Sequence, residues 1–354
     1  MKKIIIRSVI FLIPFFLISL NYLRYEISGG DLNRLGKISI EKEYRINLNR
    51  YKNSLFYNLN DSCEKKIDIL IIGDSFSQRE QTGFLDSLAD KSKYKIGKIQ
   101  NLPNKNQLQT IIEYANGDFF DSIKIKYVLV QRVERYFDKN IATDTNAIFS
   151  FKQYINSSKI KKVKEYQVQS FIEFKNLISD IIKFFKYTIL YLFDDNAFSS
   201  PVYKFELTRK LFSTQANQLL VFHHDIENIT TNNFNLKKVN SHLNLLAQKL
   251  KAKNITLIVL PATDKYDIYS KYIVNNKHPE NLFFDFFGKL EKNYLYIDSK
   301  KILSAEIQKG VLDIYFADDT HWSPIGSKII ANEAIKTIEK HESDKTIKII
   351  EVFT

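Results

Sequence analysis

Residues 67–77 read IDILIIGDSFS, an apolar run that ends in a turn of small residues with a serine in it. A short apolar run that stops at a glycine predicts a buried strand. Residues that follow such a strand lie at an edge of the sheet, and Gly73 allows the chain to turn tightly there. The stretch therefore predicts that the hydroxyl of Ser75 is presented at a sheet edge.

A base and an acid follow much later in the chain, where residues 318–326 read DDTHWSPIG. A serine hydroxyl is a poor nucleophile at neutral pH unless a base takes its proton and a third group orients that base. We predict that Ser75 is the nucleophile, that His321 is the base, and that Asp318 or Asp319 is the orienting acid.

Strand-like apolar runs alternate with helical patterns along most of the chain. Strands are expected at 67–72, 95–99, 126–131, 256–260 and 294–298, and helices at 107–114, 237–251 and 324–340. This alternation predicts an α/β fold of three layers, α/β/α, with a mainly parallel sheet. We assign residues 66–345 to this catalytic domain and 346–354 to a C-terminal tail, whose weak alternation favours an edge strand.

An interval at about 138–217 is far longer than an ordinary connection and is interpreted as a helical insertion. Within it, residues 171–193 read FIEFKNLISDIIKFFKYTILYLF, an apolar helical face interrupted by charges. The charges argue against a membrane span. Packing on the core is the expected role, and a lid over the site or a helix lying on a membrane are the alternatives.

The first 26 residues have the pattern of an uncleaved membrane anchor. Basic residues precede an uncharged stretch from Ser8 to Leu23, and the 20 residues from Ile4 are long enough to cross a bilayer. Basic residues on the N-terminal side favour an inner-membrane anchor with the catalytic domain in the periplasm or another extracytoplasmic space. Residues 27–65 are read as a stalk that leads to the first strand and carries no visible chemistry.

Composition excludes several classes. The formal charge of +12 suits anionic lipid or an acidic polysaccharide, and no nucleic-acid motif is present, so nucleic acid is not expected as a partner. The single cysteine, Cys63, excludes an intramolecular disulfide. We expect no cofactor and no metal, because residues 223–225, which read HHD, would place adjacent side chains on opposite faces of a strand.

The two motifs together resemble blocks I and V of the SGNH/GDSL hydrolase superfamily. The segment from Asp319 to Gly326 is similar to the Asp-Thr-His-Trp segment of the alginate O-acetyltransferase-like branch, the AlgX/AlgJ type. Residues 128–136, VLVQRVERY, and residues 257–269 with their Pro261 and Lys265 also resemble that branch. The resemblance implies an SGNH-type, flavodoxin-like fold, and a separate multi-span membrane acyltransferase as a partner that delivers acyl groups.

The chain departs from the family in its order and its oxyanion residues. The serine precedes the Asp-His segment, whereas in the alginate enzymes it follows. The glycine and asparagine of the superfamily name are not recognisable, which leaves as oxyanion or substrate-binding candidates Asp74, Asn104, Gln131, Arg132, Arg135 and Trp322. Of these, Asp74 is expected rather to brace the serine loop, and an ion pair with Glu134 is the plainer role for the arginines.

Two questions stay open within the motifs. Hydrolase spacing favours Asp318 as the orienting acid and the Asp-Thr-His-Trp resemblance favours Asp319; we favour Asp318. Trp322 either walls the substrate pocket, where it would stack on a sugar, or is buried beside the turn.

The expected function is O-acyl transfer, in particular O-acetyl transfer, to a cell-surface or exported polysaccharide. An extracytoplasmic carbohydrate acetylesterase is the first alternative, since transfer and hydrolysis differ only in the acceptor. A non-catalytic polysaccharide-binding or assembly component is the second.

Overall fold

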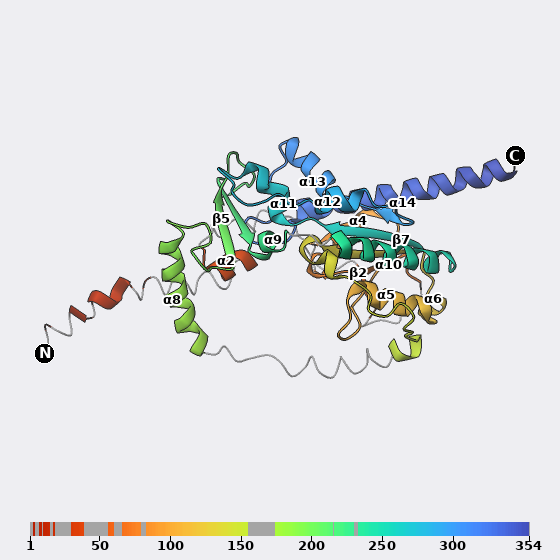
Figure 1. The fold of residues 1–354 in the computed structure, drawn as a ribbon, viewed down its shortest axis with the longest axis horizontal. Helices are drawn as coiled ribbons and strands as arrows, with labels where there is room; N and C mark the ends of the chain where they lie inside the picture. Colours follow the sequence, from red (N-terminus) through yellow and green to blue (C-terminus); the bar gives the residue numbers. More distant parts are fainter. Residues whose placement is uncertain are drawn as a thin grey trace.

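A computed structural model describes residues 3, 7–8, 10–14, 17, 30–38, 56–59, 66–78, 83–154, 174–214, 216–229 and 233–353 of the chain. Its centre is a six-stranded, wholly parallel sheet with helices on both faces (Figure 1). The strands lie in the order β1-β3-β2-β4-β7-β8, with bounds β1 Tyr57–Asn58, β2 Ile69–Ile72, β3 Ile96–Ile99, β4 Tyr127–Val133, β7 Thr256–Ala262 and β8 Leu295–Tyr296.

Without the short edge strand β1, the sheet has the flavodoxin-like order 2-1-3-4-5. Strand β2 is the first of these five and has β3 on one side and β4 on the other, so the order reverses there. Ligands of doubly wound sheets bind beyond the carboxyl ends of the strands at such a reversal. The residues that directly follow β2 are those of the Gly73-Asp74-Ser75 turn.

The two faces of the sheet bury separate apolar cores because side chains alternate along each strand. Ile69 and Ile71 point into one core and Leu70 and Ile72 into the other. The first core is covered by α4 Phe84–Lys91, α11 Lys265–Tyr269, α13 Ser299–Gln308 and α14 Pro324–Phe353. The second is covered by α5 Gln107–Asn116, α6 Phe119–Ser122, α10 Asn233–Lys251 and α12 Phe283–Gly288. The predicted three-layer α/β fold is confirmed.

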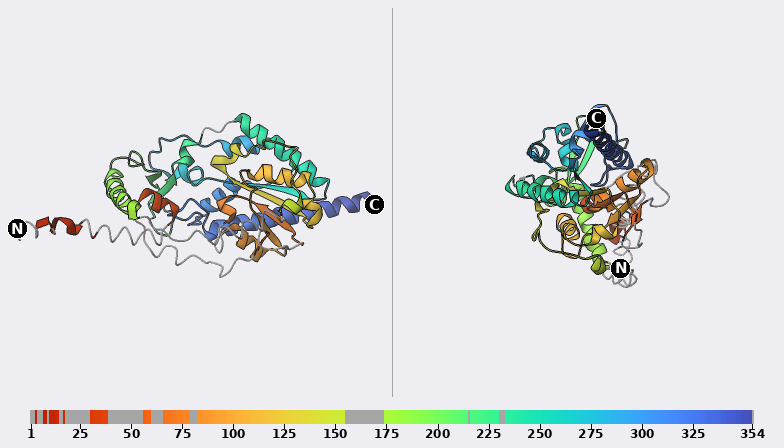
Figure 2. Two further views of the ribbon diagram at one scale, coloured as in Figure 1. Left: turned by 90° about the horizontal axis from the view of Figure 1, so that it is seen from below. Right: turned by 90° about the vertical axis from the view of Figure 1, so that its right-hand side faces the viewer.

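A small unit stands at the end of the molecule opposite the C-terminus (Figures 1 and 2). It contains an antiparallel pair, β5 Val202–Glu206 and β6 Gln218–Phe222, with the short helix α2 Asp31–Gly36 packed on it. Leu32 and Ile38 share an apolar cluster with Val202 and Leu220. Further short helices are α3 Ser75–Gln78, η2 Glu134–Lys139, α9 His224–Glu227 and η4 Ser270–Tyr272.

The predicted insertion contains the helix α8, Phe174–Leu190, but the expected role of that helix in core packing is wrong. Tyr187 is buried, whereas Ile182 and Ile189 are 62% and 56% exposed. Even on the uncharged side of the helix, Ile181 and Phe184 are only partly buried, and α8 lies on the outside of the small unit.

The C-terminal edge strand is also wrong, since α14 continues to Phe353. No glycine or proline follows Gly326, and residues 328–353 are dominated by Lys, Glu, Ile and Ala, most of which favour a helix. At the other end, the predicted anchor lies mostly outside the described residues. Among the residues that are described, no helix is both long and apolar enough to cross a membrane.

Candidate active site

The serine turn is held in one conformation by a buried glutamine. Ser75 is exposed, at the first position of α3. A Cβ on Gly73 would lie 2.5 Å from Oε1 of Gln131 and 2.6 Å from Oγ of Ser77, so no larger residue fits there. That same Oε1 accepts hydrogen bonds from Ser77 Oγ at 2.8 Å and from the N–H of Asp74 at 3.2 Å.

Asp74 braces the loop, as its position beside the serine suggests. Its carboxylate accepts from the N–H of Phe76 at 3.1 Å and from the N–H of Val133 at 2.6 Å. It also accepts from Nε2 of Gln131 at 2.9 Å. The Gln131 amide therefore donates to Asp74, and its expected role as an oxyanion donor is not supported by the geometry.

The imidazole of His321 connects the serine to a buried carboxylate. Its Nε2 lies 2.7 Å from Oγ of Ser75, and its Nδ1 lies 2.6 Å from Oδ1 of Asp319. The backbone N–H of His321 also donates to Asp319 Oδ1, at 3.1 Å. The side chain of Asp319 is 1% exposed. A short hydrogen bond to a desolvated carboxylate holds the ring and stabilises its cation.

Our preference for Asp318 as the orienting acid is therefore wrong. Its Oδ2 accepts from the N–H of Gly30 at 2.6 Å, and its carbonyl accepts from Leu32 N–H at 3.1 Å and Asn33 N–H at 3.4 Å. Asp318 thus binds the N-terminal end of α2, where backbone donors lack intrahelical acceptors.

A third carboxylate, Asp31 of α2, lies beside the pair. It accepts from Thr320 through the backbone N–H at 2.8 Å and the hydroxyl at 2.6 Å, and its Oδ2 is 3.7 Å from Nδ1 of His321. Burial and the neighbouring Asp319 raise the pKa of Asp31. The reading of residues 27–65 as a stalk without chemistry must be revised, because Asp31 contacts the histidine turn and β1 extends the sheet.

Lys265, the first residue of α11, holds the backbone of the same turn. Its ammonium donates to the carbonyls of Phe316 at 2.8 Å, Ala317 at 2.9 Å and Asp319 at 3.2 Å. The side chain is fully buried, and burial lowers its pKa to about 8. All three N–H donors of the ammonium are engaged, so the lysine acts as a brace for the acid and base.

Trp322 is 2% exposed and donates from Nε1 to Tyr315 Oη at 3.0 Å. Phe76 lies between it and the base, with ring centroids 5.0 Å from Trp322 and 4.8 Å from His321. The alternative in which this tryptophan stacks on a sugar is wrong. It packs under the turn, and Phe76 supports the imidazole.

The two arginines after β4 have different surroundings. The side chain of Arg135 is 9% exposed and forms ion pairs with Asp225 and Asp264, rather than with Glu134. Burial lowers its pKa, but the two carboxylates outweigh burial and the net pKa is raised. Arg132 is half-buried and donates to Gln107 Oε1 at 3.2 Å, and burial lowers its pKa.

These surroundings leave Arg132 as the candidate cation near the serine loop, since the charge of Asp74 is close enough to act on it. Asn104 is exposed in a turn with φ of 58° ahead of α5. Among the described residues, no hydrogen bond joins Asn104 to the serine turn.

His223 and His224 do not diverge as expected. They lie at the start of α9 rather than on a strand, and their rings stack with centroids 3.9 Å apart. Both Nδ1 atoms approach Oε2 of Glu227, at 2.9 and 3.2 Å. The ligand atoms of the three residues lie within 4.8 Å of one another, so this trio is geometrically able to hold a cation.

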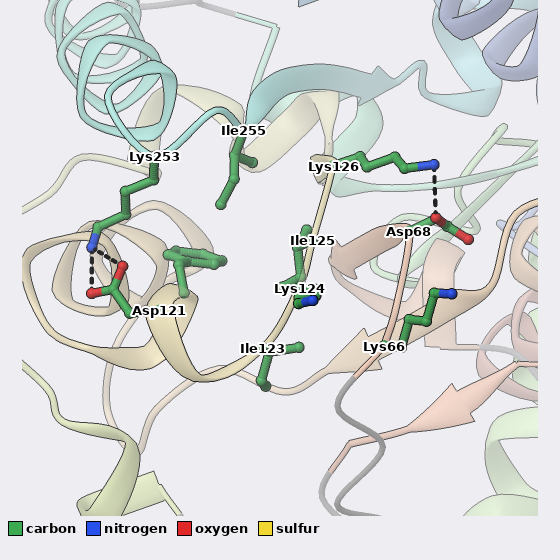
Figure 3. A pocket seen from close by; sticks show the side chains of 10 residues that line it. Lys66, Asp68, Asp121, Ile123, Lys124, Ile125, Lys126, Lys253 and Ile255 are labelled. Carbon is green, nitrogen blue, oxygen red and sulfur yellow. Dashed lines mark hydrogen bonds and ion pairs between the residues drawn. The ribbon is translucent and has the colours of Figure 1, made fainter.

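A hollow of about 320 Å³ lies at the other end of the sheet (Figure 3). It opens beside Lys66 and Lys126, which precede β2 and β4, and ion pairs join Lys126 to Asp68 and Lys253 to Asp121. Because these residues precede the strands and Ser75 follows one, the hollow is not part of the serine site.

A crystal structure of the protein YxiM from Bacillus subtilis is similar over 78% of this chain and 57% of that chain, with 11% identity and a TM-score of 0.36. The chain thus spans a little over half the length of that protein, and a likeness this weak carries no argument. No curated protein matches the chain.

A family model gives the informative match. Residues 221–349 match the model described as the SGNH hydrolase-like domain of the acetyltransferase AlgX. The matched part includes β7, Lys265, Asp319 and His321, and it confirms the resemblance drawn from the motifs. It supports an enzyme of the hydrolase or acyltransferase kind, with a carbohydrate acetyltransferase or esterase type of function. Residues 221–349 are therefore similar to the SGNH hydrolase-like domain of the acetyltransferase AlgX.

Proposed function

We propose that the chain is an O-acyltransferase, most directly an O-acetyltransferase, that modifies a cell-surface or exported polysaccharide through Ser75, His321 and Asp319. One observation carries the proposal: an unbroken series of hydrogen bonds runs from the exposed Ser75 Oγ through both nitrogens of His321 to the buried Asp319. A fold kept only for binding has no need of this proton path.

The steps follow from the geometry. His321 Nε2 takes the proton of Ser75 as Oγ attacks the acyl carbonyl, and Asp319 stabilises the imidazolium. The oxyanion forms near the N–H of Ser75, which stands at the first helical position and has no intrahelical acceptor. Collapse expels the donor alcohol, which receives the proton from His321. A sugar hydroxyl then gives its proton to His321 and takes the acyl group, which restores Ser75.

Hydrolysis is the second candidate, and the exposure of Ser75 favours it. Water that reaches the acyl-enzyme accepts the acyl group through the same base. A carbohydrate acetylesterase therefore needs no residue beyond those of the transferase.

The proposal places the domain outside the cytoplasm, tethered to the inner membrane by residues 1–26, with a multi-span membrane acyltransferase as the acyl donor. The support is the basic and apolar pattern of the N-terminal residues together with the AlgX-type match.

Two experiments test these proposals. A fluorophosphonate probe should label the full chain, label Ser122→Ala equally, and fail to label Ser75→Ala. Absence of labelling in the wild type would favour a binding role.

The second experiment separates transfer from hydrolysis, and in it an acetyl donor ester is incubated with candidate glycans. Acetylated glycan formed in excess of free acetate supports transfer, and release of acetate alone would establish the esterase.

A further inference from the structure

The outer face of α8 and the turns that follow it expose a group of large apolar side chains. Ile182 and Ile189 are 62% and 56% exposed, and Leu192, Phe193 and Phe198 are 78%, 75% and 65% exposed. Positions 182 and 189 are seven residues apart, which places them on one side of α8, and the other three residues lie in the turns that follow it. We call these five residues, with Lys183 and Lys186, the α8 face.

The exposed charges of α8 on this face are basic. Lys183 and Lys186 are exposed, and Lys186 lies four residues after Ile182, within the apolar side. Asp180 of the same helix is turned inward to an ion pair with Lys37 at 3.2 Å. In the turns beyond α8, Asp195 is exposed beside Phe193, and the Asp194 carboxylate accepts from the N–H groups of residues 196 and 198 at 3.1 and 2.6 Å. An apolar helical side with exposed lysines is the pattern of a helix that lies in the interface of an anionic bilayer.

The fold places this face close to the predicted anchor. Lys37 directly follows α2, and the Lys37–Asp180 ion pair joins it to α8. From residue 26, where the anchor is predicted to end, to Asp31 is a step of five residues, which spans at most about 18 Å when fully extended. Figure 1 and the left view of Figure 2 show α2 and α8 together at one end of the molecule, away from the C-terminus of α14.

We infer that the α8 face is a second membrane contact, which rests in the headgroup region of an anionic bilayer and fixes the orientation of the domain that the anchor only tethers. This inference rests on the proposed anchoring. Because α2 also contacts Asp318 and Thr320, the contact holds the carboxyl edge of the sheet, with Ser75, toward the membrane surface. An acyl donor embedded in the membrane is then within reach.

The test uses the full chain with Cys63→Ser, reconstituted into vesicles of phosphatidylglycerol and phosphatidylethanolamine. An environment-sensitive NBD label is placed in turn at Ile182→Cys, at Leu192→Cys and, as a control, at Ser343→Cys on the distant part of α14. We expect blue-shifted emission and quenching by lipid-borne nitroxides at positions 182 and 192, and solvent-like emission at 343. Solvent-like emission at all three positions overturns the inference, and leaves a protein partner as the occupant of the face.

A charge variant tests the basic part of the face. Each lysine at an anionic surface contributes about fivefold to binding, so Lys183→Gln/Lys186→Gln should lower the ratio of bilayer-facing to solvent-facing label about 25-fold. Vesicles of phosphatidylcholine alone should abolish the difference between this variant and the parent. An equal ratio for both on anionic vesicles would contradict the lipid assignment.

Extraction at alkaline pH separates this inference from the anchor. If the chain stays with the vesicles but the labels at positions 182 and 192 show solvent-like emission, the anchor is supported and the membrane contact of the α8 face is refuted. A chain that is extracted, yet shows buried labels before extraction, refutes the anchor and supports the face. A chain that is extracted and shows no buried label refutes both.

Discussion

Replacement of Asp319 by asparagine tests which carboxylate orients the base. The Asp319 Oδ1 and His321 Nδ1 atoms are 2.6 Å apart, and the carboxylate is 1% exposed. Coulomb's law with an effective dielectric constant of about 20 gives an attraction of ~6 kcal/mol for unit charges at this separation. The desolvation of the two charged groups offsets part of this attraction and leaves about 4–5 kcal/mol. Because each factor of ten in rate corresponds to 1.36 kcal/mol, we expect kcat/KM to fall about a thousandfold to ten-thousandfold.

The assay is hydrolysis of 4-nitrophenyl acetate by the full chain, with Asp318→Asn as the matched control. That variant removes the charge of the acceptor for Gly30 N–H but leaves the hydrogen bonds of His321 in place, so it should lose less than tenfold in kcat/KM. Circular dichroism melts verify that both variants fold. Near wild-type activity in Asp319→Asn, with collapse in a folded Asp318→Asn, would refute the assignment.

Four further predictions concern the support of the site. Asp31→Ala frees the N–H and hydroxyl of Thr320 and should lower kcat/KM about tenfold to a hundredfold, whereas Asp31→Asn should retain more activity; equal loss in both would point to charge alone. Lys265 has a pKa of about 8 in the fold, so it loses a donor proton as the pH rises through 8, and kcat/KM of the wild type should decline above that pH. Lys265→Met should have a lower kcat/KM at every pH, and its pH profile should lack the decline above pH 8. Gly73→Ala forces a Cβ against Gln131 and should cost about 1–3 kcal/mol in the free energy of unfolding by urea and most of the activity; wild-type behaviour would mean that the turn yields. Arg135→Met leaves the carboxylates of Asp225 and Asp264 buried without their partner and should cost about 3–5 kcal/mol by the same urea measurement, with a shift below 1 kcal/mol counting against the pair.

Local pattern was enough to predict the layers and the main reacting groups. The apolar run before Gly73 forms a strand because its last four residues are buried, on both faces of the sheet. Likewise the helix after Pro324 begins there because a proline at the first helical position needs no acceptor. Ser75 and His321 meet since both turns lie at the same edge of a parallel sheet.

The tail and the insertion show where local pattern failed. Weak alternation over residues 346–353 is compatible with either state, and the helix that starts at Pro324 simply continues, since adding residues to an existing helix is easier than starting a strand without a partner. For α8, amphipathicity predicts a helix correctly but does not say which side faces the protein. That choice depends on Lys37, which pairs with Asp180, and on the carbonyl of Ser199, which accepts from Tyr187 Oη.

By itself, the sequence determined the α/β alternation, the exposed serine after a buried strand, and a histidine with two adjacent carboxylates as its partner. Only the tertiary structure decided between those carboxylates. The N–H of Gly30, at the start of α2, binds the carboxylate of Asp318, whereas Asp319 accepts the N–H of Asp31 through Oδ2 and keeps Oδ1 for the imidazole. The roles of Asp31, 290 residues before His321, and of the buried Lys265 were decided in the same way. Hydrogen bonds and burial act between groups that are close in space, and no spacing along the chain records that closeness.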